Sequence, residues 1–140
     1  MEKEISKKIL IGGMALRKLG HDRHTEDHDY LIYDKSDKRD FITGEKVDYL
    51  NAGSKTYAGQ FFNEIYKIEK GNKIASAQSL FELKAFAFIQ HCQNFNFKKA
   101  DACEYDMKFL CREFSIDSVK IVNRYITNGE LSEIIKIINN

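Results

Sequence analysis

Residues 8–34 read KILIGGMALRKLGHDRHTEDHDYLIYD, and this stretch decides the fold. The short apolar run of residues 8–11 ends at Gly12-Gly13, which predicts a buried strand followed by a tight turn. A brief helical pattern follows over residues 13–19, and the glycine directly after it is well placed to end a helix. Residues 27–34 then return to contiguous β-favouring side chains, so they predict a second strand covered on both faces.

The composition predicts one ordinary domain. The chain has 140 residues, and 43% of them are hydrophobic, which is enough for a real core. A net charge of +1 gives no global attraction to nucleic acid or to an anionic membrane. No apolar run is long enough to cross a bilayer, and the N-terminal residues form no signal-like apolar segment. We therefore expect a cytoplasmic protein with no membrane partner.

Strand signals continue through the first half of the chain. Residues 35–44 are polar and turn-like, and residues 46–52 predict a third strand with Asp48 in its middle. We expect a helix around residues 57–63, and residues 65–76 predict a short hairpin around a Gly-Asn pair.

The second half of the chain changes to helical periodicity. Apolar residues recur at helical spacing in four segments, which are residues 79–93, 102–114, 116–127 and 131–138. The sequence therefore predicts an α+β protein, with a mixed β-sheet flanked by helices and a helical C-terminal part. We expect a single domain over residues 1–140, in which residues 77–140 pack on a strand-rich core of residues 1–76.

Three aspartates call for a chemical explanation. Asp27 and Asp29 alternate along the second predicted strand, so both side chains are expected on one face. Two carboxylates a few ångströms apart repel by about 4 kcal/mol at an effective dielectric near 20. A fold tolerates such a pair if a cation sits between them or if one stays protonated. If the third strand lies beside the second, Asp48 joins them, and the cluster predicts a site for a hard cation such as Mg²⁺.

The Gly12-Gly13 turn offers what an acid cluster lacks. Its backbone N–H groups and the positive end of the following helix suit a phosphate. A metal-holding acid set next to a phosphate cradle is the equipment of a phosphoryl- or nucleotidyl-transfer site. Each signal also has an ordinary alternative, because an Asp-x-Asp pair occurs on surface strands and a Gly-Gly pair occurs in simple turns.

The order of these motifs resembles the polymerase-β-like nucleotidyltransferase superfamily, in the branch of the AbiEii-type toxins and related small bacterial nucleotidyltransferases. In that branch the pattern reads Gly-Gly-x-Ala, a glycine, and then Arg-x-Thr-x-Asp-x-Asp. VDYL resembles the later strand with the family's third carboxylate, and SLFELKAFAF resembles a helix whose lysine meets the triphosphate. The matching positions are Gly12, Gly13, Ala15, Gly20, Arg23, Thr25, Asp27, Asp29, Asp48 and Lys84.

The resemblance implies a nucleotidyltransferase-type fold and a Mg²⁺- or Mn²⁺-dependent enzyme. It would transfer a nucleoside monophosphate from a nucleoside triphosphate such as ATP to a hydroxyl of an RNA or protein acceptor. The implied partners are the triphosphate, tRNA or a protein acceptor, and a cognate antitoxin or toxin in a toxin–antitoxin or phage-defence system. The alternative is a catalytically inactive binding module of the same fold, acting as an antitoxin or regulatory partner. The implied catalytic and metal-binding residues are Asp27, Asp29 and Asp48, and the implied nucleotide-binding residues are Gly12, Gly13, Arg23, Thr25 and Lys84.

Several residues keep a second interpretation. Arg23 either binds phosphate or pairs with a neighbouring aspartate, and Thr25 caps the entrance to the strand. Lys84 is otherwise a surface lysine whose stem covers apolar side chains. In KKADACEYDMKFL, either Asp101 or Asp106 corresponds to a further family acid. The aromatic residues of the helical part are expected in the core rather than in a base-stacking platform; they are Phe86, Phe88, Phe95, Phe97, Tyr105 and Phe109. The lysine pairs Lys7-Lys8 and Lys98-Lys99 are expected on solvated faces.

Overall fold

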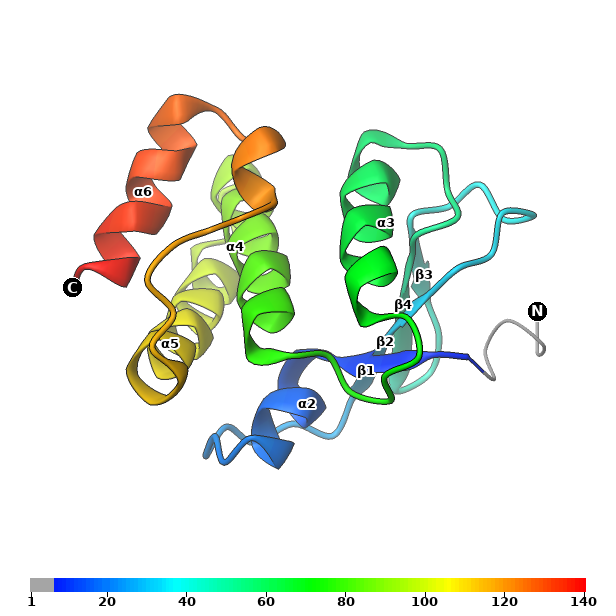
Figure 1. Cartoon of the computed structure of the whole chain (residues 1–140), viewed down its shortest axis with the longest axis horizontal. Coiled ribbons are helices and arrows are strands. Elements are labelled where there is room, and N and C mark those ends of the chain that lie inside the picture. The colour runs from blue at the N-terminus through cyan, green and yellow to red at the C-terminus, as the bar shows by residue number, and fades with distance from the viewer. Residues whose placement is uncertain (1–6) are drawn as a thin grey trace. The chain divides into compact units, whose positions relative to one another are not determined.

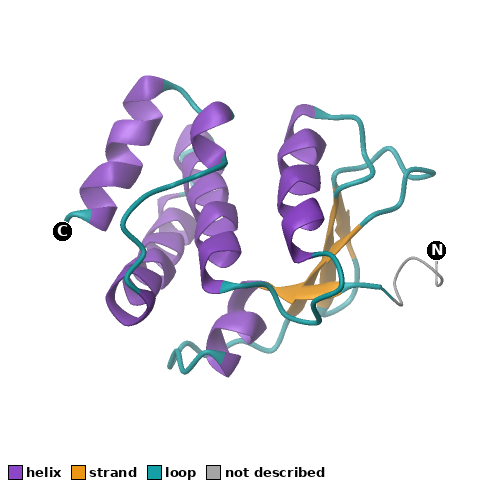
Figure 2. Ribbon diagram, in the orientation of Figure 1, coloured by secondary structure: helices purple, strands orange, loops and turns teal. Residues whose placement is uncertain are grey.

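The computed structural model describes residues 7–140, and the chain divides between Ser76 and Ala77 into two compact units (Figure 1). The first unit holds all the strands of the described residues, and the second is helical (Figure 2). The protein is therefore of the α+β class, as predicted. The boundary falls where the sequence changes from strand signals to helical periodicity. That the two parts form a single domain stays a prediction.

A mixed sheet of four short strands forms the centre of the first unit. Its order is β1-β2-β4-β3, in which β1 and β2 are antiparallel, β2 and β4 are parallel, and β4 and β3 are antiparallel. Three of these strands were predicted, and each is shorter than its predicted range. The strands are β1 (Ile9–Ile11), β2 (His28–Ile32), β3 (Phe41–Thr43) and β4 (Val47–Asn51).

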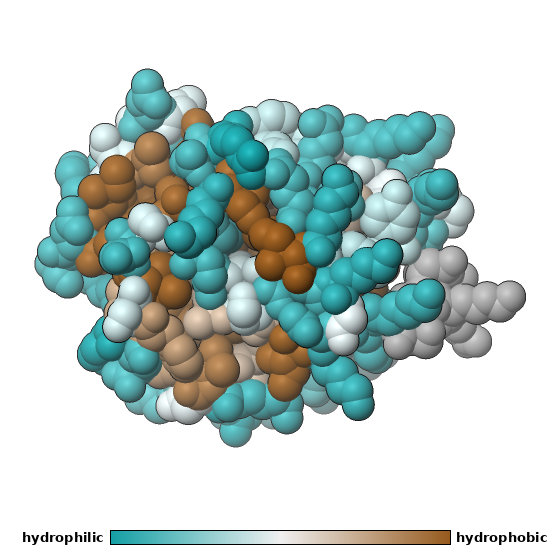
Figure 3. Space-filling view, viewed as in Figure 1, coloured by the Kyte–Doolittle hydropathy of each residue, from teal (hydrophilic) through white to brown (hydrophobic). Residues whose placement is uncertain are grey.

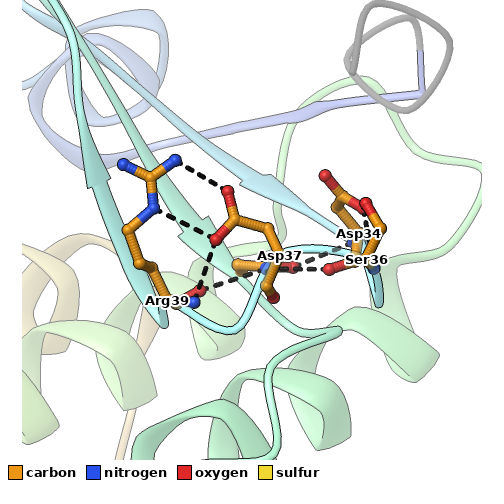
Figure 4. Close-up of polar contacts among 5 residues, drawn as sticks. Asp34, Ser36, Asp37 and Arg39 are labelled. Carbon is orange, nitrogen blue, oxygen red and sulfur yellow. Dashed lines mark hydrogen bonds and ion pairs between the residues drawn. The ribbon is translucent and has the colours of Figure 1, made fainter.

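The strand β3 lies in a segment that the sequence predicted to be only turn-like. It is an edge strand of three residues in which only the central Ile42 is buried, so it carries little apolar signal. The loop before it is held by the buried side chain of Asn51, whose amide nitrogen donates to the carbonyl oxygens of Asp34, Asp37 and Arg39. Arg39 in turn forms an ion pair with Asp37, with 2.7 Å between Nη2 and Oδ2 (Figure 4). Side-chain contacts thus shape this loop.

Two helices complete the first unit. The helix α2 (Gly12–Lys18) follows β1 without a loop and buries Ala15 and Leu16. The helix α3 (Tyr57–Glu69) begins at Thr56, whose side chain accepts a hydrogen bond from the N–H of Gly59, and it packs on β2 and β4.

The predicted hairpin over residues 65–76 is wrong. α3 continues to Glu69 because Phe61, Phe62 and Ile65 share its buried face at helical spacing. Of the two expected strands only one isolated bridge is present, between Ile74 and Leu10. The Gly-Asn pair ends the helix instead of turning a hairpin.

The second unit contains three α-helices and one short 3₁₀ turn. The helices α4 (Ala77–Gln93), α5 (Phe97–Phe114) and α6 (Asn128–Ile138) confirm three of the four predicted helical segments. The predicted helix over residues 116–127 is wrong, since only the 3₁₀ turn η1 (Val122–Arg124) forms there.

Glu82 of α4 explains why that segment stays non-helical. Its buried carboxylate accepts hydrogen bonds from the backbone N–H groups of Lys120, Ile121 and Val122, at 2.8, 3.2 and 2.8 Å. The side-chain amide of Gln78 donates to the same carboxylate at 2.7 Å. A long-range contact thus supplies the partners that a helix would have given these N–H groups.

The aromatic residues of the helical unit divide between the core and the surface. Phe86, Phe88 and Phe109 are buried as predicted, whereas the expectation of burial is wrong for Phe95 and Phe97, which are exposed. It is also wrong for Tyr105, which is exposed on α5. Apolar side chains come to the surface over α6 as well (Figure 3). Among the described residues, no helix is both long and apolar enough to cross a membrane.

Candidate functional site

The centre of the sheet is built from a repeated Asp-Tyr-Leu tripeptide. β2 reads HDYLI and β4 reads VDYLN, and the two strands pair in parallel so that like residues are neighbours. Asp29 pairs with Asp48, Tyr30 with Tyr49, and Leu31 with Leu50. This repeat is the signal from which the sequence alone would have given the register.

Asp29 and Asp48 therefore lie side by side on one face of the sheet, and both are half-buried. Adjacent strands are about 4.8 Å apart. Like charges directly opposite one another on paired strands repel and are destabilising. A bound cation or a shared proton removes this repulsion. Chemically, the pair is a place where a divalent cation is favoured.

The glycine corner at the start of α2 lies directly against this pair. Gly12 has a φ of 69°, and a Cβ built on it would overlap the carboxylate of Asp29. A Cβ on Gly13 would lie 2.9 Å from Cγ2 of Thr25. Both glycines are required because Asp29 and Thr25 approach the backbone so closely. The corner thus brings the start of α2 and Asp29 together, as the sequence predicted, and the chain's own side chains occupy the space beside both glycines.

Asp27 lies outside β2, which begins at His28, so its expected alternation with Asp29 along one strand is wrong. Its side chain is exposed, and its backbone N–H donates to Oγ1 of Thr25 at 3.3 Å. Thr25 therefore caps the approach to the strand, as one of its interpretations predicted. Arg23 is half-buried in the same segment. No group of three potential metal-ligating side chains is found within residues 7–140. This finding gives no support to a cluster of three carboxylates, and Asp27 as a third metal ligand stays a prediction.

An aromatic row occupies the opposite face of the sheet. Because side chains alternate along a strand, Tyr30 and Tyr49 point away from the face that carries the two aspartates. Their rings stack at 6.2 Å, the ring of His28 stacks on Tyr30 at 6.2 Å, and Nζ of Lys8 lies 4.3 Å from the centre of the Tyr30 ring. These cross-strand contacts stabilise the pairing of β2 with β4.

Lys84, the residue expected at the triphosphate, lies on α4 in the helical unit and is paired there. Its Nζ is 3.1 Å from Oδ2 of Asp106 on α5, and the side chains are 16% and 0% exposed. Asp101, the alternative counterpart of the family acid, is exposed on α5. The structure therefore makes Asp106 the acid that accompanies Lys84, and it gives the lysine a structural role before any ligand is considered.

Comparisons with models of known protein families, with curated proteins and with solved structures give no match. What the arrangement can do follows from its own chemistry. Two carboxylates on adjacent strands offer oxygen ligands, and a helix begins beside one of them. Sites that hold Mg²⁺ through one or two carboxylates usually take the remaining ligands from water and substrate phosphates.

Proposed function

We propose that the protein is a Mg²⁺-dependent nucleotidyltransferase of the polymerase-β-like type, which transfers a nucleoside monophosphate from a triphosphate to an acceptor hydroxyl. The observation that carries this proposal is the in-register pair of Asp29 and Asp48 beside the Gly12 corner. The sequence motifs support it, because they lie in the family's order and the two strands that bear the acids are adjacent. A role in a toxin–antitoxin or phage-defence system belongs to the same proposal.

The two carboxylates fit a magnesium ion by their chemistry, since Mg²⁺ binds through one or two carboxylates plus substrate phosphates. Asp29 and Asp48 would hold it, with Asp27 at the approach to the strand as a further ligand. When bound, the ion neutralises charge on the triphosphate. The chain's own groups orient the reactants: Asp48 accepts a hydrogen bond from the acceptor hydroxyl, and Arg23 offsets phosphate charge.

In the proposed reaction the acceptor oxygen forms a bond to the α-phosphorus of the triphosphate. The bond from that phosphorus to the bridging oxygen breaks, and pyrophosphate leaves with the electron pair. The hydroxyl proton passes to Asp48 or to water. Because little covalent chemistry falls to the protein, positioning and charge compensation supply the rate enhancement.

A second candidate is a nucleotidyltransferase-like module that binds its partner without turnover. Two observations favour it. The side chains of Asp29 and Thr25 fill the space beside Gly12 and Gly13 where a phosphate was expected, and Asp106 already pairs with Lys84. If the protein is an enzyme, the phosphate must be held by backbone N–H groups of α2 that the side chains of Asp29 and Thr25 leave accessible.

The first experiment measures thermal stability with and without Mg²⁺ and each of the four nucleoside triphosphates. Asp48→Asn should raise the melting temperature in the absence of divalent ions, because it removes the repulsion with Asp29. The same variant should lose the stabilisation by Mg²⁺ and triphosphate that the wild type shows. Asp101→Asn, which removes an exposed carboxylate on α5, is the matched control and should respond as the wild type does.

The second experiment separates the two candidates. The protein is incubated with cell extract and triphosphates labelled at the α-phosphate, and label on macromolecules is measured. The enzyme labels an acceptor in the presence of Mg²⁺, and both Asp29→Asn and Asp48→Asn abolish labelling. Nucleotide-dependent stabilisation without labelling supports the binding module. Equal labelling by wild type and both variants ends the enzyme proposal.

A further inference from the structure

The four-stranded sheet has two edges, and they differ in how they are covered. Beside β1, the N–H of Leu10 donates to the carbonyl of Lys73 at 2.8 Å, and the N–H of Ala75 donates to the carbonyl of Leu10 at 3.0 Å. Residues 73–75 thus take the place of a further strand there. At the other end of the sheet β3 pairs with β4, and no other strand within residues 7–140 pairs with its outer edge. An edge of this kind is a template for pairing with another extended chain.

The hydrogen bonds around β3 show which backbone groups point outward. The N–H of Gly44 donates to a carbonyl of β4 at 2.7 Å, and the carbonyl of Asp40 accepts from an N–H of β4 at 2.8 Å. Backbone groups alternate in direction along an antiparallel strand, so those of Ile42, midway between these two residues, also point toward β4. The N–H and C=O groups of Phe41 and Thr43 therefore point away from the sheet.

This edge lacks the features that usually prevent edge pairing. Charged side chains, prolines and bulges commonly protect edge strands. β3 reads FIT and pairs with β4 without interruption, and Phe41 is 52% exposed. Charged residues stand only at the two ends of the strand, where three acids and three bases balance. They are Asp37, Lys38, Arg39 and Asp40 before it, and Glu45 and Lys46 after it.

We propose that β3 pairs with β3 of a second copy of this chain, antiparallel about a two-fold axis at Ile42. In this register Phe41 of each copy lies opposite Thr43 of the other. Because these are the residues whose backbone groups point outward, they form two hydrogen-bonded pairs. An aromatic ring opposite a β-branched side chain further stabilises paired strands. The inference does not depend on the proposed function.

The same register is complementary in charge. Arg39 of each copy lies opposite Glu45 of the other, so the two-fold axis creates this pair twice. Nε and Nη2 of Arg39 already donate to Asp37, at 3.0 and 2.7 Å (Figure 4). The guanidinium group has further N–H donors, which a second carboxylate can use.

One pair of like charges accompanies this arrangement. Lys38 of each copy lies opposite Lys46 of the other, just beyond the strand. Asp40 lies diagonally across from the same Lys46 and offsets this repulsion. A second copy thus presents aromatic, β-branched and charged residues in the reversed order that this edge requires, which favours self-association over pairing with an unrelated strand.

Sedimentation equilibrium over a range of protein concentrations tests the proposal. The wild type should dimerise reversibly as the concentration rises, because a short ladder buries little surface. Phe41→Lys should weaken dimerisation about 10-fold or more, since a lysine on an edge strand opposes pairing. Tyr105→Lys changes an equally exposed ring, 53% exposed on α5, and should dimerise as the wild type does.

Two outcomes of this experiment would overturn the proposal. One is a wild type that stays monomeric at the highest concentration it reaches in solution. The other is a dimer that Tyr105→Lys weakens and Phe41→Lys does not, because the interface would then lie on the helical unit.

A charge exchange tests the register between two chains. Arg39→Glu and Glu45→Arg should each weaken dimerisation by about 3-fold or more, because like charges then face each other twice. An equimolar mixture of the two variants should recover the wild-type affinity, since every carboxylate again meets a guanidinium group. Within one chain the two positions are roughly 20 Å apart along the strand, so this recovery cannot arise inside a chain. A mixture no tighter than either variant alone would overturn the proposal.

Hydrogen exchange measured by NMR locates the ladder without any substitution. The N–H groups of Phe41 and Thr43 should exchange rapidly in dilute protein and become protected as the dimer forms. The N–H of Ile42 should be protected at both concentrations, because it points toward β4. If the protein dimerises while Phe41 and Thr43 exchange equally fast at all concentrations, the interface lies elsewhere and the proposal fails.

Discussion

Breaking the ion pair between Lys84 and Asp106 should destabilise the protein strongly. The carboxylate of Asp106 is fully buried, and Lys84 is only 16% exposed. Removing one partner of a buried pair leaves the other charge uncompensated, which costs about 3–5 kcal/mol. We expect Lys84→Met to lower the free energy of unfolding by about 4 kcal/mol, because the carboxylate of Asp106 stays fully buried after its ion pair is lost. Asp106→Asn should cost about 3 kcal/mol, because the lysine head can move toward water.

The double variant Lys84→Met/Asp106→Leu gives the decisive comparison. Apolar side chains of similar size replace a buried pair at little net cost. Its free energy of unfolding should therefore lie close to that of the wild type, with a coupling energy of about 3 kcal/mol or more in the double-mutant cycle. Urea unfolding measures all four proteins. In thermal scans each single variant should melt roughly 10 °C below the wild type, from about 2–4 °C per kcal/mol.

The same four proteins decide whether Lys84 also serves the nucleotide. If it does, the stable double variant should lose the stabilisation by triphosphate that the wild type shows. A cost below 1 kcal/mol for both single variants would refute the buried pair itself. A double variant with wild-type stability and a full nucleotide response would instead remove Lys84 from the proposed site and leave the pair intact.

Three other changes follow from particular contacts. Glu82→Gln replaces an acceptor of three backbone N–H groups by an amide, and should cost about 3 kcal/mol and raise hydrogen exchange in residues 120–122. Gly12→Ala should disrupt the turn between β1 and α2 and abolish Mg²⁺-dependent stabilisation, because a Cβ at this position would overlap the carboxylate of Asp29. Gly20→Ala is the control: its φ is 101° and no atom lies within 4 Å of the added Cβ, so it should show only the backbone strain of about 1–2 kcal/mol. Arg39 lowers the pKa of Asp37 to about 2, mainly through its side-chain hydrogen bond and next through its backbone N–H, so the stability from this pair is present above about pH 4 and lost as the pH falls toward 2. In Arg39→Ala, an NMR titration should find the pKa of Asp37 higher than in the wild type but still below its ordinary value, because the backbone N–H of residue 39 remains.

Three of the four strands were predictable because their signal is local. Contiguous β-favouring residues bounded by glycine or polar segments mark β1, β2 and β4, and the repeated tripeptide aligns the last two. The sequence left open whether β4 lies beside β2, and the structure shows that it does, which makes Asp29 and Asp48 neighbours. The edge strand β3 lacked the signal, since only Ile42 within it is buried.

The failures have tertiary causes. Residues 116–127 have helical spacing, but Glu82, some forty positions earlier, holds their backbone in another conformation. The Gly-Asn pair after α3 fits a hairpin as well as a helix ending, and only the burial of Ile65 decides between them. The pairing of Lys84 with Asp106 needs the packing of α4 on α5, which no local pattern contains.

The remaining question is why a chain that pairs its buried polar groups keeps an unfavourable arrangement at a few positions. Within residues 7–140 no buried side-chain nitrogen or oxygen lacks a hydrogen-bond partner, and buried groups such as Glu82 and Asn51 are fully engaged. A sequence that satisfies its interior this thoroughly is not generally strained. Against that background the neighbouring carboxylates of Asp29 and Asp48 stand out, because like charges directly opposite one another on paired strands repel. A divalent cation held between the two acids would relieve this repulsion, which is the basis of the proposed metal site.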